Sequence, residues 1–149
     1  MTEPPASDRA AEAPAHAFPF EYPVSVRFRD LDPMGHAHHS LPLIYFEEAR
    51  AAFWRRITGR DDLESIDYVI AGVRVRFLER VRFPLSAKVG LRVARIGNSS
   101  FSIEYELRGP GGRLLVEGST DQVLYDYDAG RSKVIPREIR RELEAATGA

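Results

Sequence analysis

Apolar and polar residues alternate along most of this 149-residue chain, and one segment replaces the alternation with helical spacing. Residues 22–29 alternate, with Val24, Val26 and Phe28 on one face, which predicts a half-buried strand. In residues 40–59 apolar side chains recur every three or four positions, as in an amphipathic helix. Ser40 suits its N-cap and Gly59 its C-terminal end. We therefore expect a strand followed by one long helix.

From residue 66 onward the apolar residues return to a period of two. Residues 69, 71, 73, 75 and 77 are expected to share one face of the first of these strands. Glycine-rich turns separate the segments that follow. The expected strands cover residues 66–77, 87–96, 101–108 and 113–127, and a short polar helix is expected at 136–146.

The order of these elements defines the fold class. One strand, one helix and then four strands joined by hairpins predict an antiparallel sheet with the helix on one face, an α+β fold. The strands are long, so the sheet can curve around the helix, and its edge strand could pair with a second chain. Residues 1–19 are rich in Ala and Pro, so we expect a disordered tail, with a single domain at 20–149.

The composition excludes several functional classes. A formal net charge of −1 gives no electrostatic reason to expect nucleic-acid binding. The chain has no cysteine, which excludes disulfides, thiolate catalysis and cysteine-based metal sites. No apolar run reaches the roughly 18 residues of a membrane span, and the N-terminus does not resemble a signal peptide. We expect a soluble cytoplasmic protein without a membrane partner.

Ionisable residues gather where the first strand turns into the helix. Two carboxylates, Asp30 and Asp32, precede the turn, and three histidines, His36, His38 and His39, follow it. Backbone N–H groups at a helix start can stabilise a negative charge. A carboxylate beside them can act on the group that bears this charge. This stretch is therefore the candidate site for chemistry.

Simpler interpretations of the same residues remain open. Asp32 can cap the turn or the helix, and Asp30 can be a solvated or arginine-paired loop residue. If the two carboxylates lie close together, one pKa is raised. The histidines with Asp32 could also form a zinc or iron site, although turns at helix starts favour polar residues without any metal.

Two segments resemble a known family. Residues 27–36 read RFRDLDPMGH and residues 46–50 read FEEAR. This pattern is similar to that of hotdog-fold thioesterases, in the branch that resembles 4-hydroxybenzoyl-CoA thioesterase and related acyl-CoA thioesterases. The resemblance extends to residues 77–83 and 128–136. It implies a long antiparallel five-stranded sheet wrapped around a central helix.

The resemblance also implies an activity. Members of this family hydrolyse acyl-CoA or acyl carrier protein thioesters without a metal or cofactor, as homodimers or homotetramers with the active site at the subunit interface. Asp32 matches the catalytic carboxylate and would be a nucleophile or a general base. Backbone N–H groups between Gly35 and Ser40 would form the oxyanion hole, so Gly35, His36 and His39 are candidate catalytic residues.

Some positions depart from the family pattern. His38 and His39 replace a pair of asparagines, and Pro42 replaces the usual helix tyrosine. These positions commonly shape the substrate pocket, so His38 is a candidate substrate-binding residue.

Arginines recur along one face of the 66–77 strand and just beyond it. Among them, Arg76, Arg80 and Arg82 are candidates to bind the phosphates of CoA, unless this face, with Arg74, is simply solvated. On the helix, Glu47, Glu48 and Arg50 are expected at the surface.

Two alternative functions remain. The departures at His38, His39 and Pro42 suit a hotdog module that binds an acyl-CoA-like ligand without hydrolysing it. A hotdog dehydratase would use a histidine with a helix carboxylate, such as His36 with Glu47 or Glu48. The two aspartates of the D-x-D motif argue against the dehydratase.

Overall fold

The computed structural model describes residues 18–61, 66–83 and 85–148. The prediction of a disordered tail therefore falls mostly on residues 1–17, which lie outside the described residues. Phe18 is described, and its ring centre lies 5.2 Å from the guanidinium carbon of Arg92. Phe18, which precedes the expected start of the domain at residue 20, thus already contacts the sheet.

The elements follow the predicted order, with three short elements added: two 3₁₀ turns and a two-residue strand. The full set is β1 (Phe20–Val26), η2 (Phe28–Asp30), α1 (Leu41–Thr58), β2 (Tyr68–Phe77), β3 (Leu85–Ile96), β4 (Ser100–Arg108), η4 (Pro110–Gly112), β5 (Leu114–Asp126), β6 (Arg131–Ser132) and α2 (Arg137–Ala145). Five strands form an antiparallel sheet in the order β1-β3-β4-β5-β2, and the short β6, which was not predicted, pairs with β5. Neither helix in the described part of the chain is long and apolar enough to cross a membrane.

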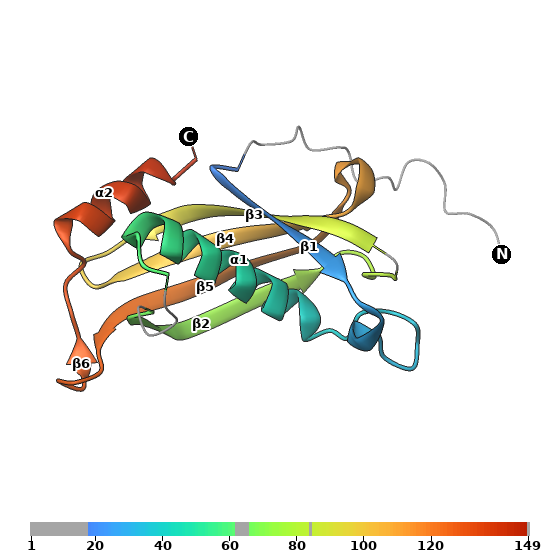
Figure 1. Ribbon diagram of the computed structural model, residues 1–149, viewed down its shortest axis with the longest axis horizontal. Helices are drawn as coiled ribbons and strands as arrows, with labels where there is room; N and C mark the ends of the chain where they lie inside the picture. Colours follow the sequence, from blue (N-terminus) through green and yellow to red (C-terminus); the bar gives the residue numbers. More distant parts are fainter. Residues whose placement is uncertain (1–17, 62–65, 84, 149) are drawn as a thin grey trace.

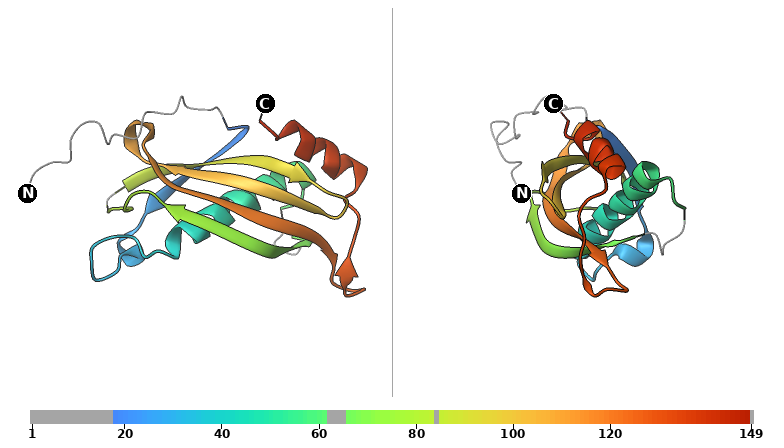
Figure 2. Two further views of the ribbon diagram at one scale, coloured as in Figure 1. Left: turned by 180° about the vertical axis from the view of Figure 1, so that it is seen from behind. Right: turned by 90° about the vertical axis from the view of Figure 1, so that its left-hand side faces the viewer.

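The sheet curls around α1 (Figures 1 and 2). The buried face of the helix meets the inner side chains of β4, where Trp54 stacks on Phe101 with ring centres 5.7 Å apart. Phe46 stacks in the same way on Tyr105, at 4.7 Å. The helix ends as predicted, because Gly59 takes a left-handed φ of 68° and donates its N–H to Arg55 O at 2.9 Å.

The first strand is shorter than predicted. It ends at Val26, and Phe28, which was expected on its buried face, is 78% exposed. The cause is local, because the Asp30 carboxylate accepts a hydrogen bond from the Arg27 N–H at 2.9 Å. This bond stabilises the single 3₁₀ turn of η2 in place of extended backbone.

The face predicted for β2 is wrong over its first residues. A register shift between Ile70 and Gly72 adds one residue to β2 relative to β5. Val69 lies opposite Val123 and Val73 opposite Thr120, so Val69 and Val73 point to opposite sides of the sheet. Val73 and Phe77 face the helix side but are 55% and 50% exposed, and β2 lies at the edge of the sheet.

Arg50 is buried, which corrects the expectation of a surface position. It is 7% exposed, and its guanidinium donates to the hydroxyls of Tyr68 and Tyr105, both at 3.2 Å. The Tyr105 hydroxyl is also 2.6 Å from Thr120 Oγ1. Burial raises the pKa of Tyr68 and of Tyr105, so both stay neutral partners of the cation.

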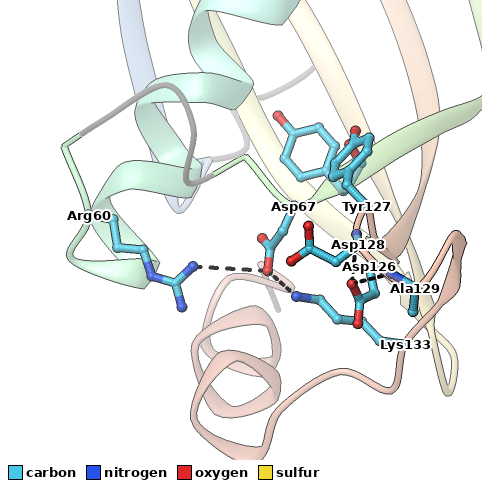
Figure 3. Close-up of polar contacts among 8 residues, drawn as sticks. Arg60, Asp67, Asp126, Tyr127, Asp128, Ala129 and Lys133 are labelled. Carbon is cyan, nitrogen blue, oxygen red and sulfur yellow. Dashed lines mark hydrogen bonds and ion pairs between the residues drawn. The ribbon is translucent and has the colours of Figure 1, made fainter.

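The segment after β5 is fixed to the start of β2 by an ion pair. Lys133 Nζ lies 2.7 Å from Asp67 Oδ2, with Arg60 at 4.0 Å from the same oxygen (Figure 3). In the intervening turn, the Asp126 carboxylate accepts the N–H groups of Ala129 and Asp128, which hold its pKa below the ordinary value. These contacts hold the segment that connects β5 to α2. Helix α2 lies at the opposite end of the fold from η2 (Figure 1).

Candidate active site

Residues 31–40, here called the Asp32 loop, connect η2 to α1. The loop closes on itself, because Leu31 pairs with Ala37 and the Asp32 N–H donates to His36 O at 2.8 Å. Gly35 takes a φ of +78°, a conformation that favours glycine, and so allows this tight turn.

A second set of contacts attaches the Asp32 loop to the segment after β2. The Ala37 N–H donates to Val81 O at 2.7 Å, and His36 pairs with Arg82. The Phe28 and Phe83 rings also meet edge to face, with centres 6.1 Å apart. The Asp32 loop is therefore supported by the segment that follows β2.

The Asp32 carboxylate has one fixed oxygen and one free oxygen. Oδ1 accepts the Met34 N–H at 2.8 Å and the His36 N–H at 3.4 Å. Oδ2 accepts no hydrogen bond from the described residues. The loop thus orients the carboxylate through its own backbone and leaves one oxygen available.

Within residues 35–40 of the described chain, only the N–H of His39 has no hydrogen-bond acceptor. The other donors are used within the loop or by its supports: Gly35 by Asp32 O, His36 by Asp32 Oδ1, Ala37 by Val81 O, His38 by Asp30 O and Ser40 by His38 Nδ1. Two of the candidates for the oxyanion hole, Gly35 and His36, therefore donate their N–H groups to Asp32 and are not free to bind a substrate. His39 keeps a free donor just before the helix.

The two histidines that replace asparagines lie side by side on the surface. The ring centres of His38 and His39 are 4.0 Å apart. His38 Nδ1 accepts the Ser40 N–H at 3.2 Å, and the Ser40 hydroxyl is 2.8 Å from the same nitrogen. Histidine Nδ1 and asparagine Oδ1 are both attached to Cγ, so His38 provides an acceptor at a similar place. His38 thus accepts the N–H of Ser40, the N-cap residue of α1, and the Ser40 side chain itself makes no capping hydrogen bond.

Asp30 and Asp32 have separate partners. Asp30 is 9% exposed, and its Oδ2 accepts the Tyr45 hydroxyl at 2.8 Å as well as the Arg27 N–H. Burial, followed by the Asp30 carboxylate, raises the pKa of Tyr45, which therefore stays protonated as a donor. Asp30 is not a solvated or arginine-paired residue but a buried acceptor.

Tyr45 was not among the residues predicted from the sequence. It lies one turn into α1 and is 4% exposed, beside the buried Phe46. A tyrosine on a buried helix face needs a partner for its hydroxyl. That requirement, with a carboxylate fifteen residues earlier, is the signal that could have predicted the pair.

The candidate arginines are separated by the fold. Arg82 lies beside the Asp32 loop through its pairing with His36, and Arg80 is exposed in the same segment. Arg76 is instead ion-paired with Glu117 of β5 at 3.4 Å. Arg74 and Arg76 also line a surface cavity of about 370 Å³ together with Arg92, Glu104 and Glu117. Within the described part of the chain, the polar partner of Arg76 is Glu117 and not a residue of the Asp32 loop.

Other candidate groups lie outside this arrangement. Glu47 and Glu48 are exposed on α1, as expected for surface residues. Among residues 18–61, 66–83 and 85–148, no three His, Asp or Glu side chains are grouped so that they could hold a metal ion. The Asp32 loop thus presents one free carboxylate oxygen and one free N–H, an arrangement suited to attack on a carbonyl group.

Comparisons with known proteins match most of the chain. The model of the family described as "Thioesterase-like superfamily" matches residues 26–143. A thioesterase of Thermus thermophilus, solved with coenzyme A and zinc, is 33% identical, with a TM-score of 0.79 over 89% of this chain and 96% of that one. A predicted thioesterase of Bacillus stearothermophilus is 24% identical, with a TM-score of 0.81 over 86% of this chain and 96% of that chain.

A curated relative gives a similar coverage. The uncharacterized protein YsmA of Bacillus subtilis (strain 168) is 25% identical over 116 residues, which is 78% of this chain and 79% of that protein. The family model, which matches residues 26–143, spans the Asp32 loop, α1 and strands β2 to β6.

Proposed function

The chain belongs to the thioesterase-like superfamily and has the hotdog fold, and on this premise we propose that it hydrolyses the thioester bond of an acyl-CoA. The observation that carries the proposal is the Asp32 loop. It holds Asp32 Oδ1 with two backbone N–H groups, leaves Oδ2 free and leaves the His39 N–H without an acceptor. A carboxylate and an N–H donor are the two groups that thioester hydrolysis requires.

Asp32 acts on the carbonyl carbon of the thioester in one of two ways. As a nucleophile, Oδ2 attacks this carbon, CoA leaves as the thiolate, and water then hydrolyses the resulting anhydride. As a general base, Oδ2 removes a proton from a water molecule, which attacks the carbon directly. Both routes convert the thioester and water into a carboxylic acid and free CoA.

The His39 N–H stabilises the negative charge that develops on the carbonyl oxygen. One donor of this kind typically contributes about 3 kcal/mol to transition-state stabilisation. Gly35 and His36 act indirectly, because their N–H groups hold the loop and the Asp32 carboxylate.

CoA is the proposed carrier because the Thermus thermophilus relative was solved with coenzyme A. Arg82 and Arg80 are proposed to bind its phosphates, since both are exposed next to the Asp32 loop. His38 is proposed to border the acyl group, because its ring lies on the exposed side of this loop.

The experiment is a thiol-release assay with aromatic, short-chain and long-chain acyl-CoAs. The chain has no cysteine, so a thiol reagent detects only the CoA product. Turnover of at least one substrate supports the proposal. The preferred acyl group then shows which size and type of acyl chain the pocket accepts. If no acyl-CoA is turned over by folded protein, hydrolysis of acyl-CoA is ruled out and the non-catalytic binding module becomes the better account.

The edge strand β2 supports a homodimer as part of this proposal. Its Val73 and Phe77 side chains face the helix side of the sheet, yet about half of each is exposed. A second copy that pairs along β2 would bury these side chains and extend the sheet. Sedimentation analysis of Val73→Glu should give monomers, with Val134→Glu as the control, because Val134 is equally apolar and exposed but lies after β6. A monomeric wild-type protein would contradict this assembly.

A further inference from the structure

Asp30 connects three segments of the candidate active site, two through its carboxylate and one through its backbone carbonyl. Its Oδ2 accepts the Arg27 N–H at the end of β1 and the Tyr45 hydroxyl from α1, at 2.9 and 2.8 Å. Its backbone carbonyl accepts the His38 N–H at 2.9 Å. A single residue therefore fixes the strand, the helix and the second half of the Asp32 loop relative to one another.

The residues that these three bonds hold precede and follow the Asp32 carboxylate and the His39 N–H along the chain. Asp32 follows Asp30 by two residues, and the free His39 N–H follows the His38 N–H that Asp30 holds. The position of the N–H donor relative to the Asp32 carboxylate therefore depends on where Asp30 lies. Positioning errors of about 1 Å can reduce enzymatic rates a hundredfold.

The Tyr45 hydroxyl is the side-chain donor among the two hydrogen-bond donors to the Asp30 carboxylate in the described part of the chain. Asp30 is 9% exposed and has no ion pair within the described residues, so its buried carboxylate relies on hydrogen-bond donors for stabilisation. A buried carboxylate that loses a donor is strongly disfavoured and moves towards water. Such a movement would pull on the Arg27 and His38 contacts together.

We propose that Tyr45 and Asp30 are positioning residues that set the geometry between the Asp32 carboxylate and the His39 N–H, a role that rests on the proposed thioesterase function. Neither side chain touches the substrate. Tyr45 holds the Asp30 carboxylate from the helix, and Asp30 holds the loop through His38 and Arg27. The pair thereby couples α1 to the strand-to-loop junction across fifteen residues of sequence.

The test is the kinetics of Tyr45→Phe, which removes only the hydroxyl. We expect kcat to fall about 10- to 100-fold with little change in KM, because positioning and not substrate binding is lost. The matched control is Tyr105→Phe, which removes another buried tyrosine hydroxyl, bonded to Arg50 and Thr120. That variant should lose stability but keep a kcat close to the wild-type value.

Variants of Asp30 test the same contact from the other side. Asp30→Asn keeps an oxygen acceptor and should retain more turnover than Asp30→Ala. Tyr45→Phe should then reduce kcat only slightly in the Asp30→Ala background, because the bond is already lost. Additive effects of the two substitutions would overturn the proposal, as would a Tyr45→Phe variant with the same kcat as Tyr105→Phe.

Amide hydrogen exchange of His38 provides a readout that does not need turnover. Its N–H donates to Asp30 O, so Tyr45→Phe should accelerate its exchange and Tyr105→Phe should not. Unchanged exchange in Tyr45→Phe overturns the positioning role. If the wild-type protein itself releases no thiol, the proposed function fails, and the exchange rate alone then supports or overturns the connection.

Discussion

The Asp32 carboxylate accepts the backbone N–H of Met34, two residues further along the chain, at 2.8 Å. A carboxylate held in this way by its own loop has a fixed direction before any ligand arrives. The turn that carries the donor depends on Gly35, whose φ of +78° lies in the left-handed region. The geometry of the loop can therefore be tested at a residue with no side chain.

Gly35→Ala should lower turnover through backbone strain alone. No atom lies within 4 Å of the added Cβ, so the substitution causes no clash. The left-handed conformation costs a non-glycine residue about 1 kcal/mol, and relief of this strain shifts the N–H groups that hold Asp32. Thiol release and urea unfolding would both be measured.

Gly111→Ala is the matched control for this substitution. Gly111 has a φ of +74° and equally open surroundings, but it lies in η4, outside the Asp32 loop. It should cost a similar free energy of unfolding and leave kcat/KM unchanged. Equal losses of activity in both variants would mean that general destabilisation, and not the loop, explains the effect.

Gly118→Ala should destabilise the packing of α1 on the sheet. The added Cβ would lie 2.8 Å from Phe46 Cε2 and 3.0 Å from Arg74 O. Phe46 is held between this glycine and Tyr105, so it has little room to move. Overpacking of this kind costs about 1–3 kcal/mol. Urea unfolding followed by the fluorescence of Trp54, the sole tryptophan, would measure the loss, and an unchanged midpoint would contradict the packing described.

The buried tyrosines predict a loss of stability at alkaline pH. Burial raises the pKa of Tyr68 and Tyr105 in the folded protein, whereas in the unfolded chain tyrosines ionise near pH 10. The unfolded state therefore loses protons first. Stability is fully present below about pH 10 and falls as the pH rises through the higher folded-state pKa values.

Urea unfolding above and below this pH would test the sign. The slope of unfolding free energy against pH should be shallower in Tyr105→Phe, because one of the titrating groups is removed. A slope identical to that of the wild-type protein would show that Tyr105 does not contribute to the alkaline transition.

The sequence predicted the order of the elements because their apolar periodicity is local. It did not predict the extra residue in β2 at Ile70–Gly72, since a bulge changes the face of a strand without changing its composition. It placed Arg50 of α1 at the surface, because the hydroxyls that satisfy its guanidinium come from two strands, Tyr68 on β2 and Tyr105 on β4. Long-range partners of this kind leave no trace in the spacing of nearby residues.

The candidate site was predicted only in part, because some of its contacts also come from distant segments of the chain. The family motif located the turn between strand and helix, and the structure builds a closed loop there. Which N–H remains free depends on contacts with Val81 and Asp30 that cannot be read from the motif. The role of Tyr45 depends on a hydrogen bond between an α-helix and a 3₁₀ turn.

The most direct test of the proposed function compares the wild-type protein with Asp32→Asn on its best acyl-CoA substrate. The substitution keeps the size of the side chain and an acceptor for the Met34 N–H but removes the nucleophile or base. Asp121→Asn is the control, because Asp121 is exposed on β5 and bonded to Ser102. We predict that kcat falls at least about a hundredfold in Asp32→Asn and is unchanged in Asp121→Asn. Turnover by folded Asp32→Asn at the wild-type rate would contradict the assignment of Asp32 as the catalytic carboxylate.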